Sequence, residues 1–317
     1  MNETVDAKAR RRRDPSYEDL RPRTFAIAYR MLGSVSEAED VVQETLLRVH
    51  NAIEQGETIS SPRAYAATVA TRLAIDELRS ARARRETYVG EWLPEPVTER
   101  AEDDPARQAE LADSLSLAFL VVLESLSPEQ RAAFLLHDVF DYDYERVAEI
   151  VGTSEANARQ LASRARRHVD EGRTRFDASE EQRKELAASF FAAMQNGDFE
   201  ALEALLAADV ELHGDGGGLG PAIRHPIFGR AKTARMFRNW WQLGERIGGL
   251  QLRRVTVNGQ PGAEFVDLDG TLISVMALDI ADGKIQTIRS IVNPEKLSHL
   301  GRVADPKELL ARIRESR

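Results

Sequence analysis

The chain has 317 residues, of which 42% are hydrophobic and 30% are charged, and its formal net charge at pH 7 is −9. This length predicts two or three domains, and the absence of cysteine excludes disulfides, thiolate metal ligands and thiol catalysis. The longest apolar run, Leu117–Leu123, is far shorter than the roughly 20 residues of a membrane span, and no apolar segment follows the N-terminal arginines. We therefore expect a soluble, cytoplasmic protein.

The net charge hides an uneven distribution. Residues 91–110 contain seven acidic and two basic side chains, whereas arginines gather in two stripes at the ends of helix-patterned segments. One such stripe alone is typical of a solvated helix face, but two of them favour contacts with phosphates. The stripes are Arg79, Arg82, Arg84 and Arg85, and then Arg159, Arg164, Arg166 and Arg167.

Residues 15–88 carry a helical apolar pattern. The first helix is predicted to end near Gly33, and the segment Ser36–Glu39 resembles a capping box with Ser36 as the cap. A second helix is expected to reach Ile53, and a loop then extends to Ser61. Pro62 suits the first position of a third helix, which runs into the first arginine stripe.

Residues 111–172 are predicted to be helical again. The segment Ser127–Gln130 combines a cap, a proline at the first helical position and a glutamine at the third. Two further helices, 143–151 and 155–169, are separated by Gly152, which is the pattern of a helix-turn-helix. A plain helical hairpin remains the alternative. The face predicted to meet solvent or DNA comprises Arg159, Gln160, Ser163, Arg164 and Arg167.

After about residue 180 the pattern changes. Helices are expected at 182–195 and 199–207 and around Trp240, and strands at 210–213, 252–257, 264–268, 271–280 and 284–292. The dipeptide Asp282-Gly283 is a hairpin signal. Helices followed by antiparallel strands predict an α+β domain, and residues 301–317 are expected to be a polar tail with a short helix.

Three segments resemble a known family. Residues 24–50 and 62–85 resemble region 2 of the extracytoplasmic-function (ECF) sigma factors of bacterial RNA polymerase, and residues 123–170 resemble region 4. The stretches WLPEP, DGGG and NPEKL, at residues 92–96, 215–218 and 293–297, are similar to signatures of the SigJ-like subgroup. Two residues depart from the family pattern: Arg72 stands where asparagine is frequent, and Glu295 where aspartate is.

The resemblance implies two all-α sigma domains followed by an α+β SnoaL-like domain of the NTF2 superfamily. The implied order is an N-terminal tail (1–14), region 2 (15–88), an acidic linker (89–110), region 4 (111–172), a second linker (173–182), the SnoaL-like domain (183–300) and a C-terminal tail (301–317). The implied function is promoter-specific initiation by core RNA polymerase, with a fused regulatory domain in place of a separate anti-sigma protein.

The resemblance also assigns roles to residues. Docking on the β′ clamp helices, with the β subunit as a further contact, falls to Asp40, Gln43, Glu44, Leu47 and Arg48. Contacts with −10 DNA fall to Arg63, Tyr65, Arg72, Asp76, Arg79 and Arg82, with the loop Gln55–Ser61 holding a flipped base. Contacts with −35 DNA fall to Glu155, Arg159, Gln160, Ser163, Arg164 and Arg167. Each assignment has an alternative. The docking residues could form a solvated helix face, Tyr65 could belong to the core, and Glu155 could favour the helix dipole.

The C-terminal domain is expected to dock on both helical modules and to use the linker as its contact strand. The implied regulatory residues are Trp92, Leu93, Pro94, Glu95 and Pro96, then Asp215, Gly216, Gly217 and Gly218, and then Asn293, Pro294, Glu295, Lys296 and Leu297. In the alternative reading, Trp92 caps a local core.

Other functions remain open from the sequence. His213, Asp215 and His225 could form an acid–base group of a SnoaL-type cyclase or isomerase fused to a DNA-binding module. A helix-turn-helix regulator with a small-ligand domain and a pure adaptor are further alternatives. We expect no catalytic residue, metal or cofactor, and an unknown small ligand is a candidate partner of the C-terminal domain.

Overall fold

The structure is a computed structural model that describes residues 17–85, 87–99, 116–172, 179–219, 222–246 and 248–315, with the side chains of 81–85 and 172 left aside. The chain forms two compact units, each described here by itself. Residues 1–83 and 123–171 form the first, and residues 84–122 and 172–317 the second. Within the described ranges, no helix is long and apolar enough to cross a membrane.

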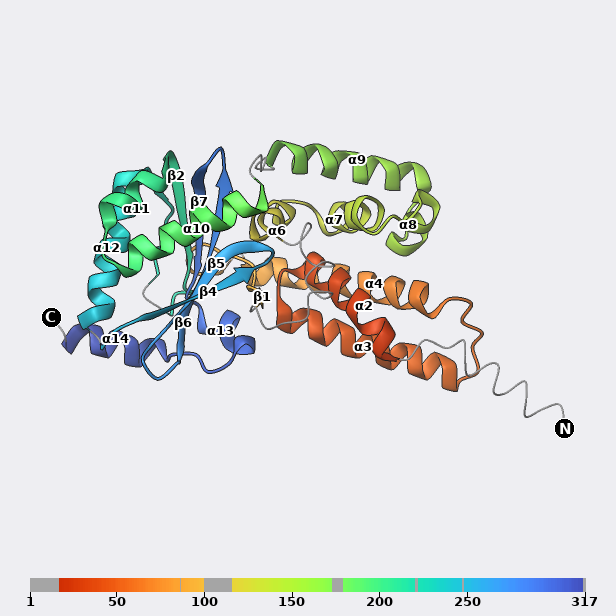
Figure 1. Cartoon of the computed structure of the whole chain (residues 1–317). Coiled ribbons are helices and arrows are strands. Elements are labelled where there is room, and N and C mark those ends of the chain that lie inside the picture. The colour runs from red at the N-terminus through yellow and green to blue at the C-terminus, as the bar shows by residue number, and fades with distance from the viewer. Residues whose placement is uncertain are drawn as a thin grey trace. The chain divides into compact units, whose positions relative to one another are not determined.

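The first unit begins with three helices, which Figure 1 colours from red to orange. Gly33 adopts a φ of +67°, which ends the first helix because this left-handed conformation is easily reached without a Cβ atom. Leu20, Val49 and Ala66, one from each helix, pack together, with Tyr65 partly buried against them. The helices are α2 (Tyr17–Leu32), α3 (Val35–Glu54) and α4 (Pro62–Arg85).

The cap of α3 is not the residue that the sequence pattern suggested. Ser34 is the N-cap: its backbone is extended and its hydroxyl accepts from the backbone N–H of Glu37. Ser36 lies inside the first turn, and its hydroxyl is 3.1 Å from that of Ser34. The sequence contains two overlapping Ser-x-x-Glu patterns, and the earlier one is used because Gly33 has just ended α2.

The remainder of the first unit is the helix-turn-helix that the sequence predicts. Ser127 forms a complete capping box with Gln130, and Gly152, with a φ of +77°, ends the helix before the turn. Leu136, Val147 and Ala158 belong to one buried cluster that joins the elements. They are α6 (Leu117–Glu124), α7 (Pro128–Phe134), a π-helical turn (Leu135–Val139), α8 (Tyr144–Val151) and α9 (Glu155–Gly172); most of α6 belongs to the second unit.

The second unit packs helices against a seven-stranded sheet of order β1-β4-β5-β6-β7-β2-β3, as the expected α+β class requires (Figure 1). The β2–β7 pair is parallel and the other pairs are antiparallel. Its helices are α10 (Glu180–Gln195), α11 (Phe199–Leu205), α12 (Arg230–Arg246), α13 (Pro294–Leu297) and α14 (Pro306–Glu315). Its strands are β1 (Thr98–Glu99), β2 (Leu206–Asp215), β3 (Ile227–Phe228), β4 (Gln251–Val257), β5 (Gln260–Val266), β6 (Leu272–Ala281) and β7 (Lys284–Ile291).

The sheet has a core on each face. Met276 and Leu278 of β6 point into a core shared with the helices α10, α11 and α12, which we call the helix-face core. Val275 and Ala277 of the same strand belong to a second core that also contains Leu93 of the linker, which we call the linker-face core. The alternation follows from the two-residue period of a strand. The central strands therefore separate two different environments.

Candidate functional site

The exposed side of α3 carries the residues expected to dock on polymerase. Asp40, Gln43, Leu47 and Arg48 are exposed, and Glu44 is half-buried and paired with Arg48 at 2.7 Å. Leu47 is 52% exposed. This face is therefore accessible to a partner surface, and its role in docking stays a prediction.

Two of the residues expected at the −10 element are engaged within the first unit. The guanidinium of Arg72 donates to the carbonyl oxygens of Glu149 at 2.8 Å and Ile150 at 3.1 Å. These carbonyls lie in the last turn of α8, where they have no intrahelical partner and the helix dipole is negative. Arg79 pairs with Glu129 of α7 at 2.7 Å. The candidate −10 helix thus contacts the helix-turn-helix.

The other −10 candidates divide between surface and core. Arg63 and Asp76 are exposed, and Asp76 lies 3.3 Å from Arg79. Tyr65 is half-buried against Leu20 and Val49, so its ring contributes to the core. The side chain of Arg82 lies outside the described residues. Most of the loop 55–61 is exposed.

Arg131 joins the helix-turn-helix to α2 from the inside. It is 2% exposed, and its guanidinium donates to the carbonyl oxygen of Met31 at 2.5 Å and to Glu124 at 3.0 Å. Arg146 adds a second link, with hydrogen bonds to Thr68 at 2.9 Å and to the Ala64 carbonyl at 3.3 Å. Sequence reasoning did not single out either arginine, because their partners lie on other helices and leave no local pattern.

The second helix of the helix-turn-helix, α9, presents the face expected from the sequence. Glu155, Arg159, Gln160, Ser163, Arg164 and Arg167 are exposed, whereas Ala158, Ala162, Ala165 and Val169 are buried. Arg159 pairs with Glu155 and lies 4.6 Å over the ring of Tyr144. Arg166 pairs with Asp138 at 2.6 Å. Arg164 and Arg167 are therefore better placed than Arg166 to meet a nucleic acid.

The three short signatures of the linker and the C-terminal domain meet at one ion pair. Asp215, 0% exposed, and Lys296, 6% exposed, lie 2.6 Å apart. The backbone N–H of Leu93 donates to Asp215 Oδ2 at 2.8 Å, and the Leu93 carbonyl accepts from Lys296 Nζ. The linker backbone is thus held by both members of a buried ion pair, which also satisfies polar groups that would otherwise be costly to bury.

Two aromatic side chains of the linker complete this centre. Lys296 Nζ lies 4.1 Å from the ring centroid of Trp92 and 4.9 Å from that of Tyr88, distances that suit cation–π attraction. The Tyr88 hydroxyl donates to Asp215 Oδ1 at 2.5 Å and accepts from Asn293 Nδ2 at 2.9 Å. Burial first, and then Asp215, raise the pKa of the Tyr88 phenol. Sequence reasoning missed Tyr88, which lies just outside the WLPEP stretch.

The glycines of the DGGG stretch let the backbone approach its neighbours. Gly217 and Gly218 adopt φ values of +58° and +73°, and the N–H of Gly217 donates to Asp215 Oδ1 at 3.1 Å. A Cβ atom on Gly217 would lie 2.5 Å from Asn293 Nδ2, and one on Gly218 would lie 2.9 Å from Val89 Cβ in the linker. Gly216 is buried directly beside Asp215.

The linker continues along the domain beyond this centre. Pro94, Glu95 and Pro96 are buried, and the Pro96 carbonyl accepts from His299 Nε2 at 2.8 Å. The linker then pairs as strand β1 with β4, adding an edge strand to the sheet. Leu297 of the NPEKL stretch lies in the linker-face core with Leu93, whereas Asn293 caps α13, Pro294 opens it and the Glu295 side chain is exposed.

The three residues considered for acid–base chemistry do not gather. His213 bonds to Glu91 of the linker at 2.6 Å and to Glu211 at 2.9 Å, Asp215 belongs to the ion pair, and His225 is exposed. Burial opposes the charged imidazole, but the two carboxylates outweigh it and raise the pKa of His213. His213 therefore contributes a further link to the linker.

Two family models match the helical segments that make up the first unit. Residues 16–84 match the family model of sigma-70 region 2, and residues 116–169 match that of sigma-70 region 4. The first range covers α2 to α4 and the second covers α6 to α9, except for the last residues of α4 and α9.

Two curated relatives from Mycobacterium tuberculosis cover nearly the whole chain. The chain is 38% identical to the ECF RNA polymerase sigma factor SigJ over 89% of this chain and 92% of that protein, and 31% identical to the probable ECF RNA polymerase sigma factor SigI over 86% and 91%. The crystal structure of M. tuberculosis SigJ matches with a TM-score of 0.72 and 37% identity, covering 89% of this chain and 97% of that one. The chain therefore belongs to the extracytoplasmic-function RNA polymerase sigma factors.

Proposed function

We propose that this ECF sigma factor is held in a restrained form by its own C-terminal domain, which captures the linker between regions 2 and 4. The sigma regions direct core RNA polymerase to promoters at the −35 and −10 elements. The C-terminal domain supplies the regulation. The observation that carries the proposal is the ion pair Asp215–Lys296, which holds the backbone of Leu93 from both sides.

The geometry of the tether explains why capture would restrain the protein. Residues 86–116, which join α4 to α6, could span about 100 Å if extended. Leu93 and Leu117 lie in the same linker-face core. With both in place, residues 86–92 remain as the connection to α4, and they span about 25 Å at most. Capture thus removes most of the reach that the tether provides.

The distance between promoter elements is larger than this reach. The −35 and −10 elements are about 25 base pairs apart, or about 85 Å of duplex at 3.4 Å per base pair. Within the first unit, however, Arg72 of α4 is hydrogen-bonded to α8 of the helix-turn-helix. One packed unit cannot place α4 and α9 on elements this far apart, so we infer that the regions separate on polymerase.

Polymerase would compete with the C-terminal domain for the linker. The linker carries Glu91, Glu95 and Glu99, and a basic polymerase channel would attract such a segment. The exposed face of α3 around Leu47 is our candidate for the first contact with the β′ clamp helices. Polymerase can shift the equilibrium between the captured and the open form only to the extent that it binds the open form more tightly than the captured one. We place the reaction in the cytoplasm, where polymerase works.

We propose no catalysis in the C-terminal domain. Of the three residues considered for acid–base chemistry, Asp215 and His213 are bonded to the linker, and His225 is exposed. Because Asp215 and His213 bind a segment of the same chain, the domain is better suited to regulation than to catalysis.

Run-off transcription with core polymerase tests the proposal. Trp92→Ala and Lys296→Met remove linker contacts without touching α3, α4 or α9, and we expect each to raise the yield of specific transcript. The matched control, Lys284→Met, changes an exposed lysine on β7 that bonds to the carbonyl of Ala204. Unchanged transcription in both linker variants, with normal polymerase binding, would contradict the proposal.

A further inference from the structure

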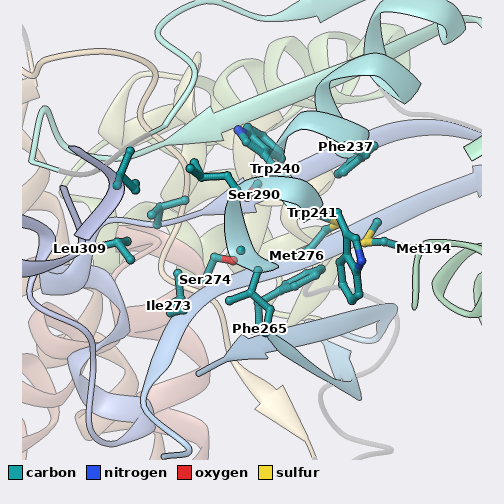
Figure 2. A pocket seen from close by; sticks show the side chains of 15 residues that line it. Met194, Phe237, Trp240, Trp241, Phe265, Ile273, Ser274, Met276, Ser290 and Leu309 are labelled. Atoms are coloured by element: carbon teal, nitrogen blue, oxygen red, sulfur yellow. The ribbon is translucent and has the colours of Figure 1, made fainter. Parts of the chain in front are cut away.

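A cavity of about 140 Å³ lies on the helix face of the sheet, on the opposite side from the linker. Figure 2 shows Met194 and Trp241 at one end and Leu309 at the other. Its walls come from α10, α12, the strands β5, β6 and β7, and the C-terminal helix α14. A cavity of similar size is known to bind a single aromatic ring. Closure by α14 gives the segment beyond residue 300 a role in the domain.

The lining is chemically uniform. Phe237, Trp240, Trp241, Phe265 and Met276 supply aromatic and sulfur contacts, and among the described residues the lining includes no charged side chain. The lining residues that carry polar groups are Ser274 and Ser290, with hydroxyls, and Trp240 and Trp241, with indole N–H groups. An apolar cavity with a few hydrogen-bonding groups is the usual composition of a small-molecule site.

We propose that this cavity binds a neutral, mainly apolar molecule of one or two rings that carries a hydroxyl or carbonyl group. The ring would pack against Trp241 and Phe265, and its polar group would bond to Ser274 or Ser290. A charged ligand is disfavoured because its charge would lose hydration without a partner. With no carboxylate or imidazole in the lining, the ligand would be bound and not converted.

The cavity and the linker share the same strands. Ser290 and Met276 form one cross-strand pair on the cavity side, and the next pair, Ile291 and Val275, faces the linker-face core. Val292 also lines the cavity, and its backbone N–H donates to the carbonyl of Asp215 at 2.7 Å. A ligand that shifts β7 would therefore move Asp215, on which Leu93 depends. This coupling rests on the regulatory role proposed above, whereas the binding site itself does not.

Tryptophan fluorescence can test the site directly. The chain has three tryptophans, so Trp92→Phe leaves only Trp240 and Trp241 as reporters. We expect 2-naphthol to quench their emission with saturation, and 2-naphthalenesulfonate, of similar shape but charged, to bind at least tenfold more weakly. No saturation by 2-naphthol up to its solubility limit, or equal affinity for the sulfonate, would overturn the proposal.

Two variants locate the probe. Ser274→Phe fills the cavity and should weaken 2-naphthol at least tenfold, whereas Ser189→Phe makes the same change at an exposed position of α10 and should not. Equal affinity in both would overturn the proposal. If Ser274→Phe does not fold, the double variant Ser274→Ala with Ser290→Ala decides: it should weaken 2-naphthol severalfold and leave naphthalene unaffected, and equal effects on both probes count against the site. Saturable binding with transcription indifferent to linker variants would support the site and contradict the regulatory role.

Discussion

Asp215 and Lys296 lie 2.6 Å apart in the interior of the C-terminal domain, and each also bonds to the backbone of Leu93. Their positions are 81 residues apart in sequence, and Leu93 is 122 residues from Asp215. A buried pair of this kind is weak evidence for stability in itself, but removal of one partner leaves an uncompensated charge. The pair is therefore well suited to report whether the linker is in place.

Lys296→Met should destabilise the second unit by about 3–5 kcal/mol, because Asp215 would remain buried and charged. Urea unfolding of the full chain measures the loss, and hydrogen exchange should increase at residues 88–99. The double variant Asp215→Asn with Lys296→Met should recover part of the loss. A double variant as unstable as the sum of the two single variants would show that the groups do not act as a pair.

Gly218→Ala should loosen the linker more than Gly283→Ala does. Both glycines have positive φ, so alanine strains each backbone by a similar 1–2 kcal/mol or so. Only at Gly218 would the new Cβ also meet the linker, at Val89, whereas nothing lies within 4 Å at Gly283. Hydrogen exchange at residues 88–93 should separate the two variants. Equal exchange in both would mean that the close approach is unimportant.

The link from His213 to the linker should weaken as the pH rises. Glu91 and Glu211 raise the pKa of His213 in the folded chain against the opposing effects of burial and Arg289. The folded state thus holds a proton that the unfolded state releases, so this stabilisation is complete below about pH 6.5 and is lost as the pH rises through the raised pKa. Urea unfolding across this range should show the decline. His213→Gln should flatten it, and an unchanged profile would exclude His213 as its source.

Arg131→Met should weaken the packing between the two sigma regions, because it removes the buried guanidinium and its hydrogen bonds to the Met31 carbonyl and to Glu124. We expect a loss of about 3–5 kcal/mol, measured by urea unfolding. The control Arg166→Met removes a half-exposed pair and should cost no more than about 1 kcal/mol. Similar losses in both would argue against a special role for Arg131.

Arg164→Ala should weaken binding of −35 DNA by about 1–3 kcal/mol if the side chain reaches a base edge, with relaxed specificity at one position. A phosphate contact would instead lower the salt slope by about one unit. Arg166→Ala on the same helix should have a smaller effect because Arg166 is engaged by Asp138. Fluorescence anisotropy with polymerase present measures both, and equal loss in the two variants would contradict the assignment.

Features encoded by neighbouring residues could be predicted from the sequence. The capping box at Ser127, the glycine that ends α8 and the hairpin at Asp282-Gly283 all depend on contacts within a few positions. The α+β class followed from the order of helices and strands. The three signatures at residues 92–96, 215–218 and 293–297 were known only through resemblance, and no local pattern indicated that they would share one ion pair.

Features that depend on distant partners were missed. The strands β1 and β3 have two residues each, which is too short for an alternating hydrophobic pattern. They form because they pair with β4 and β2, respectively. The short helix expected beyond residue 300 is present as α14, but its burial was missed: the segment reads as a polar tail, yet Leu309 and Ile313 are buried against the cavity. The burial of Arg131 was also missed. It depends on contacts with Met31 and Glu124, which no local sequence pattern encodes.

A distance measurement tests the central claim most directly. The chain has no cysteine, so Glu57→Cys and Asp170→Cys, both at exposed positions of the first unit, would carry the only two labels. We predict that core polymerase with promoter DNA lengthens this distance, and that Lys296→Met lowers the polymerase concentration at which the change occurs. An unchanged distance on polymerase, or the same transition concentration with and without Lys296, would contradict control of the sigma regions by linker capture.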